Sequence, residues 1–119
     1  MHRVTVTRRK TSISSELLPG TLEMLILKTL SRRPAHGYAV ARHLEQMSAD
    51  VLQVGESSLY PALQRLLVSG WVTAEWGETE SGRRARFYRI TPAGRKRLAV
   101  EAAGFERVIG AIAAIMQEG

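Results

Sequence analysis

The sequence predicts a mainly α-helical fold with a small β-hairpin, built within 119 residues, the length of one domain. Apolar residues recur at helical spacing in four separate stretches, the last of them long. Between the third and fourth stretches, two runs rich in β-branched and aromatic residues flank a glycine-containing loop. The chain carries 45% hydrophobic and 24% charged residues, which is near the globular average and argues against a disordered or fibrous protein.

Residues 1–15 are expected to form a basic, flexible arm, because they hold four basic residues and no acid before position 16. Such an arm either reaches along the groove of a polyanionic partner or remains a disordered tail.

Two short helices are expected next. The first runs from Thr21, which can cap free backbone N–H groups, to Leu30, and Pro34 stops it. The second runs from about Gly37 to Met47. Each helix has one apolar stripe, formed by Leu22, Leu25, Ile26 and Leu30 in the first and by Val40, Ala41, Leu44 and Met47 in the second.

The third helix is expected to begin near residues 56–58 and to end at Gly70, in a left-handed cap. Pro61 is expected in its first turn, where a missing N–H does no harm. Its apolar face is formed by Leu59, Leu63, Leu66 and Leu67. The opposite face is polar, with small residues near its start, and presents Ser57, Ser58, Tyr60, Pro61, Gln64 and Arg65.

The two β-rich runs, Trp71 to Trp76 and Ala85 to Ile90, predict a hairpin with a long tip. Residues 81–100 hold seven bases and no acid, and three of these bases, Arg83, Arg84 and Arg86, belong to the hairpin. Outside this stretch and the arm, six bases face all eleven acids. The positive charge is therefore concentrated in two places, which favours a polyanionic partner over the alternative of a solvated basic loop.

The last helix is expected over about residues 92–117, with Thr91 as its N-cap and Pro92 at its first position. At this length it measures about 39 Å, more than the three shorter helices can cover. Its apolar residues are spaced 4, 3, 4, 3 and 4 apart, the seam of a coiled coil: Leu98, Ala102, Phe105, Ile109, Ile112 and Met116. We expect residues 92–119 to form a dimerisation helix. The alternative is packing onto the first helix of the same chain, and each can hold for different turns.

Three helices followed by an arginine-bearing hairpin is the order of a winged helix-turn-helix, here residues 16–91. In that arrangement the third helix enters the major groove of DNA, and the hairpin, called the wing, touches the neighbouring backbone. Ser57, Ser58, Tyr60 and Gln64 can hydrogen-bond to phosphates and base edges, and Gln64 suits adenine. The wing arginines would bind phosphates and supply affinity. Two alternatives remain open: one serine caps the helix, and the Tyr60 ring packs on the core.

Four segments, within residues 17–98, resemble the PadR family of transcriptional regulators in order and spacing: Leu18–Leu27, His36–Tyr38, Ser58–Leu66 and Gly82–Gly94. The resemblance implies a homodimeric winged-helix repressor that binds a pseudo-palindromic operator in double-stranded DNA and is released by a small-molecule effector. It also implies that residues 56–67 form the recognition helix. Some relatives bind flat aromatic drugs between tryptophans at the dimer centre, whereas Trp71 and Trp76 are expected here in the wing.

Other classes of protein lack support in the sequence. The absence of cysteine excludes disulfides and thiolate metal sites. No phosphate-binding loop or nucleophile motif occurs, so we expect neither an enzyme nor a cofactor. His36 and His43 lack a third ligand, and capping of a helix explains His36, so we expect no metal. The longest apolar stretch, Val108–Met116, is too short to span a bilayer, and we expect a cytoplasmic protein without membrane contact.

These observations predict a sequence-specific, dimeric, DNA-binding transcription regulator that acts as a repressor. Two alternatives belong to different classes. A non-specific architectural DNA-binding protein would show little preference for an operator. A winged-helix module that binds other proteins would carry an apolar or acidic exposed face on the third helix, and the sequence shows neither.

Overall fold

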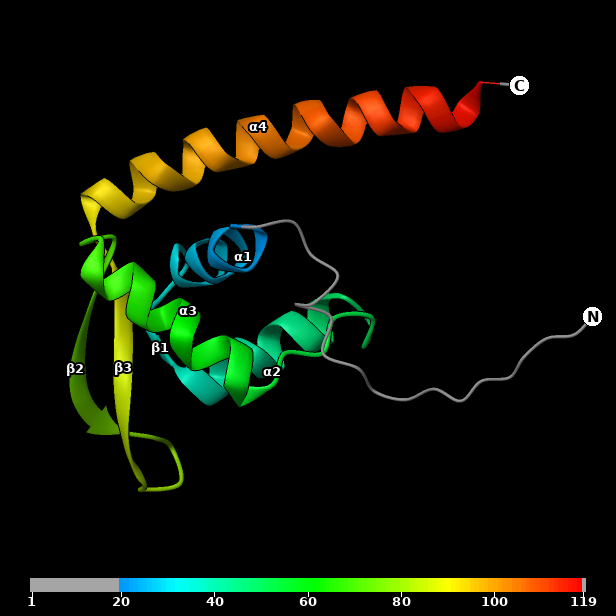
Figure 1. Ribbon diagram of the computed structural model, residues 1–119. Helices are drawn as coiled ribbons and strands as arrows, with labels where there is room; N and C mark the ends of the chain where they lie inside the picture. Colours follow the sequence, from blue (N-terminus) through cyan, green and yellow to red (C-terminus); the bar gives the residue numbers. More distant parts are fainter. Residues whose placement is uncertain (1–19, 119) are drawn as a thin grey trace, which may run out of the picture.

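The computed structural model describes residues 20–118, so the expected arm at residues 1–15 lies outside the described part. In chain order the elements are α1 (Thr21–Leu30), β1 (Ala35–His36), α2 (Gly37–Met47), α3 (Glu56–Val68), β2 (Val72–Glu78), β3 (Arg84–Ile90) and α4 (Pro92–Gln117). α4 lies across the top of the molecule next to α1, and the β2–β3 hairpin projects from the opposite end (Figure 1). The predicted order of helices and hairpin is confirmed.

A cluster of buried apolar side chains joins the three short helices to the sheet. Fully burying one such side chain contributes about 1.5–3 kcal/mol, so this cluster is the main source of stability. Its largest fully buried members are Ile26, Leu27, Leu30, Val40, Leu59, Leu63, Leu66 and Val72. The helical spacing identified most of them in the sequence.

The sheet has three antiparallel strands in the order β1-β3-β2. β2 pairs with β3 from Val72 opposite Ile90 to Glu78 opposite Arg84, so the predicted hairpin is confirmed and is slightly longer than expected. β1 was not predicted from the sequence. Its two residues, Ala35 and His36, pair with Tyr88 and Phe87 and tie the start of α2 to the hairpin.

Two predicted helix ends are confirmed. Gly70 follows α3 with φ of 77°, and the N–H groups of Gly70 and Trp71 donate to the carbonyls of Leu67 and Leu66, both at 3.0 Å. This pattern is the Schellman motif, which satisfies carbonyls at the end of a helix. At the start of α4, the Thr91 hydroxyl accepts a hydrogen bond from the N–H of Gly94 at 3.0 Å.

Two predicted details of helix starts are wrong, although the helices begin where expected. Gly20, in the left-handed conformation with φ of 86°, occupies the N-cap of α1, and Thr21 is a buried first residue instead of the cap. Pro61 is the sixth residue of α3 and lies in its second turn, because the helix begins at Glu56. Proline has no N–H, so the carbonyl of Ser57 lacks its usual partner four residues later.

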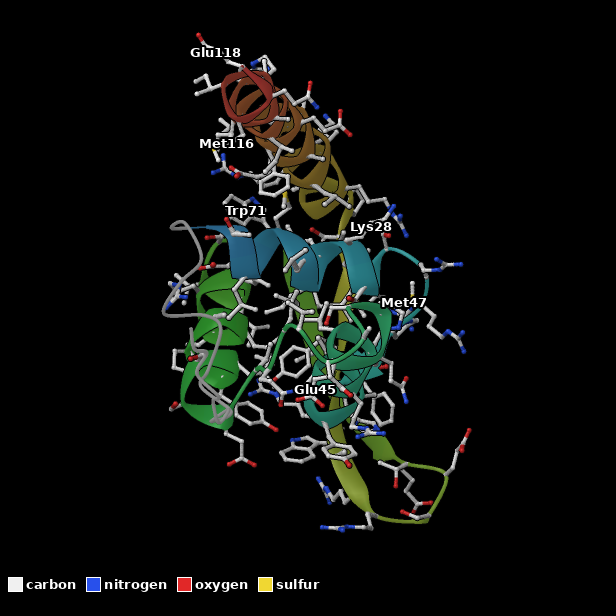
Figure 2. The ribbon with its side chains drawn as sticks, turned by 90° about the vertical axis from the view of Figure 1, so that its right-hand side faces the viewer. Lys28, Glu45, Met47, Trp71, Met116 and Glu118 are labelled. Atoms are coloured by element: carbon white, nitrogen blue, oxygen red, sulfur yellow. The ribbon has the colours of Figure 1, made fainter. Side chains whose placement is uncertain are left out.

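Trp71 and Gly94 form the joint between α4 and the rest of the molecule. Trp71 was expected in the wing, but it precedes β2 and lies between α1 and α4 (Figure 2). The Arg97 guanidinium is 4.7 Å from the centre of its indole ring. A Cβ atom added to Gly94 would lie 2.1 Å from the carbonyl oxygen of Trp71, so only glycine permits this contact. The joint therefore fixes the direction of α4.

Candidate nucleic-acid interface

The polar face of α3 is open to solvent because its apolar residues, Leu59, Ala62, Leu63 and Leu66, are buried on the other side. Gly55 occupies the N-cap, so neither serine of the first turn stands at that position. Ser58 is half-buried and already interacts within the chain. The exposed residues of the predicted recognition face are Ser57, Tyr60, Pro61, Gln64 and Arg65. Short side chains at the start of α3 leave room for close approach of a large ligand.

The sequence left open whether Tyr60 faces a ligand or packs its ring on the core, and the structure shows both features. Its ring packs against the start of α2, where a Cβ on Gly37 would lie 3.0 Å from Cε1 and the hydroxyl oxygen of Tyr60. Its side chain nevertheless remains 44% exposed. Partial burial, with smaller effects from Glu56 and Tyr88, raises the pKa of Tyr60 above its usual value. The hydroxyl is therefore protonated at neutral pH and can donate a hydrogen bond.

Arg65 is separated from the other predicted contacts. Its Nε donates to Oε2 of Glu23 at 2.5 Å, which links α3 to α1. The side chain is 59% exposed, so solvent screens this ion pair and its contribution to stability is small. The ion pair holds the guanidinium beside α1, away from the start of α3.

The hairpin of the wing has two faces, and the side chains on one of them pack into the core at the base of the hairpin. Alternate residues of a strand share a face, so Arg84 and Arg86 lie on the same side as the buried Tyr88. The register places Trp76 opposite Arg86 on that side. We call Trp76, Arg84, Arg86 and Tyr88 the front face of the wing. Because Tyr88 packs in one core cluster with Leu59 and Leu63 of α3, the front face borders α3.

Trp76 is a candidate contact that was not predicted from the sequence. Its side chain is 61% exposed, and the Arg84 guanidinium lies 4.7 Å from the centre of its ring. The Arg86 guanidinium is 6.0 Å from the ring of Tyr88. Cation–π contacts of this kind orient both arginines along the front face. The sequence could have identified Trp76, because it is a tryptophan in the strand that pairs with the arginine-rich strand.

The tip of the wing is a closed turn. The N–H of Thr79 donates to the carbonyl of Arg83 at 2.8 Å, and the N–H of Arg83 donates to the Thr79 hydroxyl at 3.1 Å. Gly82 supplies the positive φ, 86°, that this turn requires. These bonds hold Arg83 exposed at the end of the hairpin.

The predicted dimerisation seam is divided between two environments. Leu98, Ala102 and Phe105 are half-buried, and Leu98 packs against the core. Ile109, Ile112 and Met116 are 46%, 48% and 75% exposed. Figure 1 shows that the outer half of α4 extends past the end of α1. The alternative of packing on the first helix therefore holds for the inner turns, and the outer turns remain uncovered in the single chain.

We also searched the described residues for a metal site and for a membrane-spanning helix. In residues 20–118, no three His, Cys, Asp or Glu side chains are grouped so that they could hold a metal ion. His36 instead caps α2, since its Nδ1 accepts from the N–H of Ala39 at 3.3 Å, as predicted. None of the described helices combines the length and the apolar character needed to cross a membrane.

Comparisons with known proteins agree with this architecture. The model of the transcriptional regulator PadR-like family matches residues 26–100. A PadR family transcriptional regulator from Eggerthella lenta is 29% identical, with a TM-score of 0.73, over 90% of this chain and 91% of that one. A transcriptional regulator from Clostridium thermocellum is 26% identical, with a TM-score of 0.72, over 80% of this chain and 92% of that one.

An uncharacterized 37.1 kDa protein in a transposon of Streptomyces fradiae is 38% identical over 90 residues, which are 76% of this chain. The chain spans only 24% of the length of that relative. The family model nevertheless covers well over half of the chain, and the fold is shared with the solved regulators. This chain therefore belongs to the PadR-like family of transcriptional regulators.

Proposed function

We propose that the protein is a sequence-specific regulator that binds a pseudo-palindromic operator in double-stranded DNA as a homodimer and represses transcription. One observation carries the proposal of DNA binding. The exposed polar face of α3 lies beside the arginine-bearing front face of the wing, because Tyr88 of the wing and the apolar side of α3 pack in the same core. The repressor role and release by a small-molecule effector are supported by the resemblance to the family.

The polar face of α3 and the front face of the wing would have different roles in binding DNA. The start of α3 would enter the major groove, where Ser57, Tyr60 and Gln64 reach base edges and nearby phosphates. Arg83, Arg84 and Arg86 would bind phosphates, which gives affinity for any sequence. Arg65, with its ion pair to Glu23, would position α3 on α1.

The uncovered half of α4 supports the homodimer. Ile109, Ile112 and Met116 continue a heptad seam whose inner residues are already half-buried, and a second copy of the helix would cover them. A twofold axis along α4 would place the two α3 helices about one turn of DNA apart, roughly 34 Å. Each protomer would then read one half of an inverted repeat.

Selection from a pool of random-sequence duplexes tests the proposal and identifies the operator in the same experiment. The full-length protein should enrich an inverted repeat whose half-sites are about one helical turn apart. Enrichment without any preferred sequence would instead indicate an architectural DNA-binding protein. Failure to retain any duplex would contradict DNA binding itself and leave a protein-binding module as the better interpretation.

Gel-shift titrations with the selected operator and a shuffled duplex then separate the two surfaces. Replacing Arg83 and Arg84 with alanine should weaken binding to both duplexes alike and flatten the dependence of log K on log salt by about 0.9 per lost phosphate contact. Replacing Gln64 with alanine should weaken binding to the operator more than to the shuffled duplex. Equal losses on both duplexes would contradict base reading by Gln64.

A further inference from the structure

The rear face of the wing borders an open hollow, which shares Arg83 and Arg84 with the interface described above but whose opposite wall that interface does not use. Ala85 and Phe87 of β3 point into it, on the side of the hairpin away from Trp76 and Arg86. The opposite wall is formed by the turn after α1 and by α2, including Met47 (Figure 2). The hollow has a volume of about 1350 Å³ and is open to solvent.

The charges of this hollow are unevenly distributed. The wall formed by the turn after α1 and by α2 carries Arg32, Arg33 and Arg42, all exposed, and none of the described residues that line this wall is acidic. Among residues 20–118, the two ion pairs are Arg65–Glu23 and Arg97–Glu101, so neither uses these arginines. The acidic residues lie on the other walls, Glu78 and Glu80 on the wing next to Arg83 and Arg84, and Glu56 at the start of α3. We call Arg32, Arg33 and Arg42 the basic wall.

The position of the basic wall relative to the wing suggests what it binds. When α3 occupies the major groove, the adjacent wing lies over the minor groove, which is only about 6 Å wide. The two backbones of that groove must then pass on the two sides of the wing. One backbone passes between the wing and α3, along the front face. The other passes along the rear face, where the hollow and the basic wall lie.

We propose that the hollow behind the wing is a phosphate channel, in which Arg32, Arg33 and Arg42 bind the far strand of the minor groove. The inference rests on the proposed binding of duplex DNA and extends it. The wing would be held between two backbones, and the footprint of each protomer would extend beyond the half-site on the wing side. An open hollow with guanidiniums outside any ion pair on one wall suits a continuous polyanion, because each phosphate can meet an arginine without being enclosed.

The acids on the wing side determine where the strand would lie. Glu80 stands in the turn of the wing and lines the hollow. Repulsion between its carboxylate and a phosphate would direct the strand toward the basic wall. Replacing Glu80 with glutamine removes this repulsion while keeping the size of the side chain.

The test compares the binding of a variant without these arginines to a long and to a short DNA duplex. The variant R32A/R33A/R42A is titrated against two duplexes with the selected operator. One extends a full helical turn beyond the half-sites, and the other ends at their outer edges. On the long duplex we expect affinity to fall at least about tenfold at low salt and the salt slope to flatten by about 2 to 3. On the short duplex the variant and the wild type should bind within about twofold of each other.

A control variant removes three positive charges elsewhere on the surface. Lys28, Lys96 and Arg107 are exposed and do not line the hollow. The variant K28A/K96A/R107A should therefore bind both duplexes alike, relative to the wild type. Thermal unfolding followed by circular dichroism verifies that both variants fold. E80Q should bind the long duplex about two- to threefold more tightly and leave binding to the short one unchanged.

The outcomes separate this inference from the proposed function. If R32A/R33A/R42A binds the long duplex like the wild type while R83A/R84A is weakened, the phosphate channel is wrong and DNA binding by α3 and the wing stands. Equal weakening on the long and short duplexes would also overturn the channel, since the contacts would then lie within the half-site. If the wild type binds neither duplex, the proposed function itself fails.

Discussion

The winged-helix unit, residues 20–91, and the outer half of α4, residues 106–117, differ in where their apolar side chains are buried. In the unit, Ile26, Leu63 and Leu66 are 0% exposed. In the outer half of α4, Ile112 is 48% and Ile115 66% exposed, although both regions repeat apolar residues at helical spacing. The first region buries its apolar side chains within one chain, and those of the second remain exposed. Binding of DNA and assembly into dimers should therefore be separable by mutation.

We expect the largest effect from a substitution at Gly94, where α4 joins the winged-helix unit. Gly94→Ala places a Cβ 2.1 Å from the carbonyl oxygen of Trp71. The obstructing atom belongs to the backbone, so relief requires moving the start of β2 or the axis of α4. We expect the free energy of unfolding to fall by more than about 3 kcal/mol, measured by urea denaturation.

Gly110 provides a matched control in the same helix. No atom lies within 4 Å of a Cβ added there, beyond the helix's own neighbouring backbone. Gly110→Ala should leave stability unchanged or raise it by up to about 1 kcal/mol, because alanine favours a helix. Similar losses in both variants would show that the cost comes from losing glycine as such and not from the contact with Trp71.

The outer half of α4 is tested by a charge in its apolar seam. Ile112→Asp would bury a carboxylate from each protomer at a twofold interface, while the winged-helix unit remains intact. We expect the dissociation constant of the dimer to rise at least about 100-fold, which corresponds to about 2.7 kcal/mol. Sedimentation equilibrium measures it, and affinity for the full operator should fall with it.

Ala114→Asp adds the same charge at a similar distance from the end of α4. At 100° per residue, position 114 lies on the opposite side of the helix from Ile112. This variant should remain as dimeric as the wild type. If the two variants change the dimer to the same extent, the apolar seam is not the interface.

The sequence predicted the elements whose signals are local and repeated. Apolar periodicity placed α1, α2, α3 and α4, and the residue types of the ends placed Gly70 and Thr91 as caps. β1 escaped detection because two residues are too few to form a pattern. Thr21 was assigned a capping role from its residue type alone, although Gly20, with its positive φ, already begins the helix.

Features that depend on distant parts of the chain escaped prediction. Arg65 pairs with Glu23, 42 residues away, and a helical face read by itself does not reveal such a partner. Trp71 and Trp76 are five positions apart, yet one lies against α4 and the other on the front face of the wing. Their environments depend on where the strand begins and on which face meets the core. The basic wall is likewise assembled from α2 and a turn, which no single motif contains.

A smaller effect is expected from the hydroxyl of Thr91. It accepts from the N–H of Gly94 at 3.0 Å and donates to the carbonyl of Gly70 at 2.8 Å, so it links the ends of two helices. Thr91→Ala should lower the free energy of unfolding by about 1–2 kcal/mol. Thr91→Ser keeps the hydroxyl and should recover most of the loss. Failure of serine to recover it would assign the loss to the methyl group.

The smallest expected effect uses the two tryptophans as reporters of the two regions. In Trp71→Phe, the remaining indole is Trp76, which is 61% exposed beside Arg84 on the front face of the wing. The selected operator duplex should lower the acrylamide quenching constant of its fluorescence about twofold, because a backbone would cover the ring. Replacing Trp76 with alanine should weaken binding only a few-fold, about 1 kcal/mol, since the neighbouring arginines remain.

Trp76→Phe reverses the experiment and leaves Trp71 as the reporter at the joint. Trp71 lies between α1 and α4 under Arg97, away from the front face, so DNA should not change its quenching. A response of Trp76 without a response of Trp71 would mean that DNA covers the wing and leaves the joint undisturbed. If Trp71 responded as strongly, binding of DNA would move α4 relative to the winged-helix unit. The two regions would then be coupled, and the separation of DNA binding from assembly would be wrong.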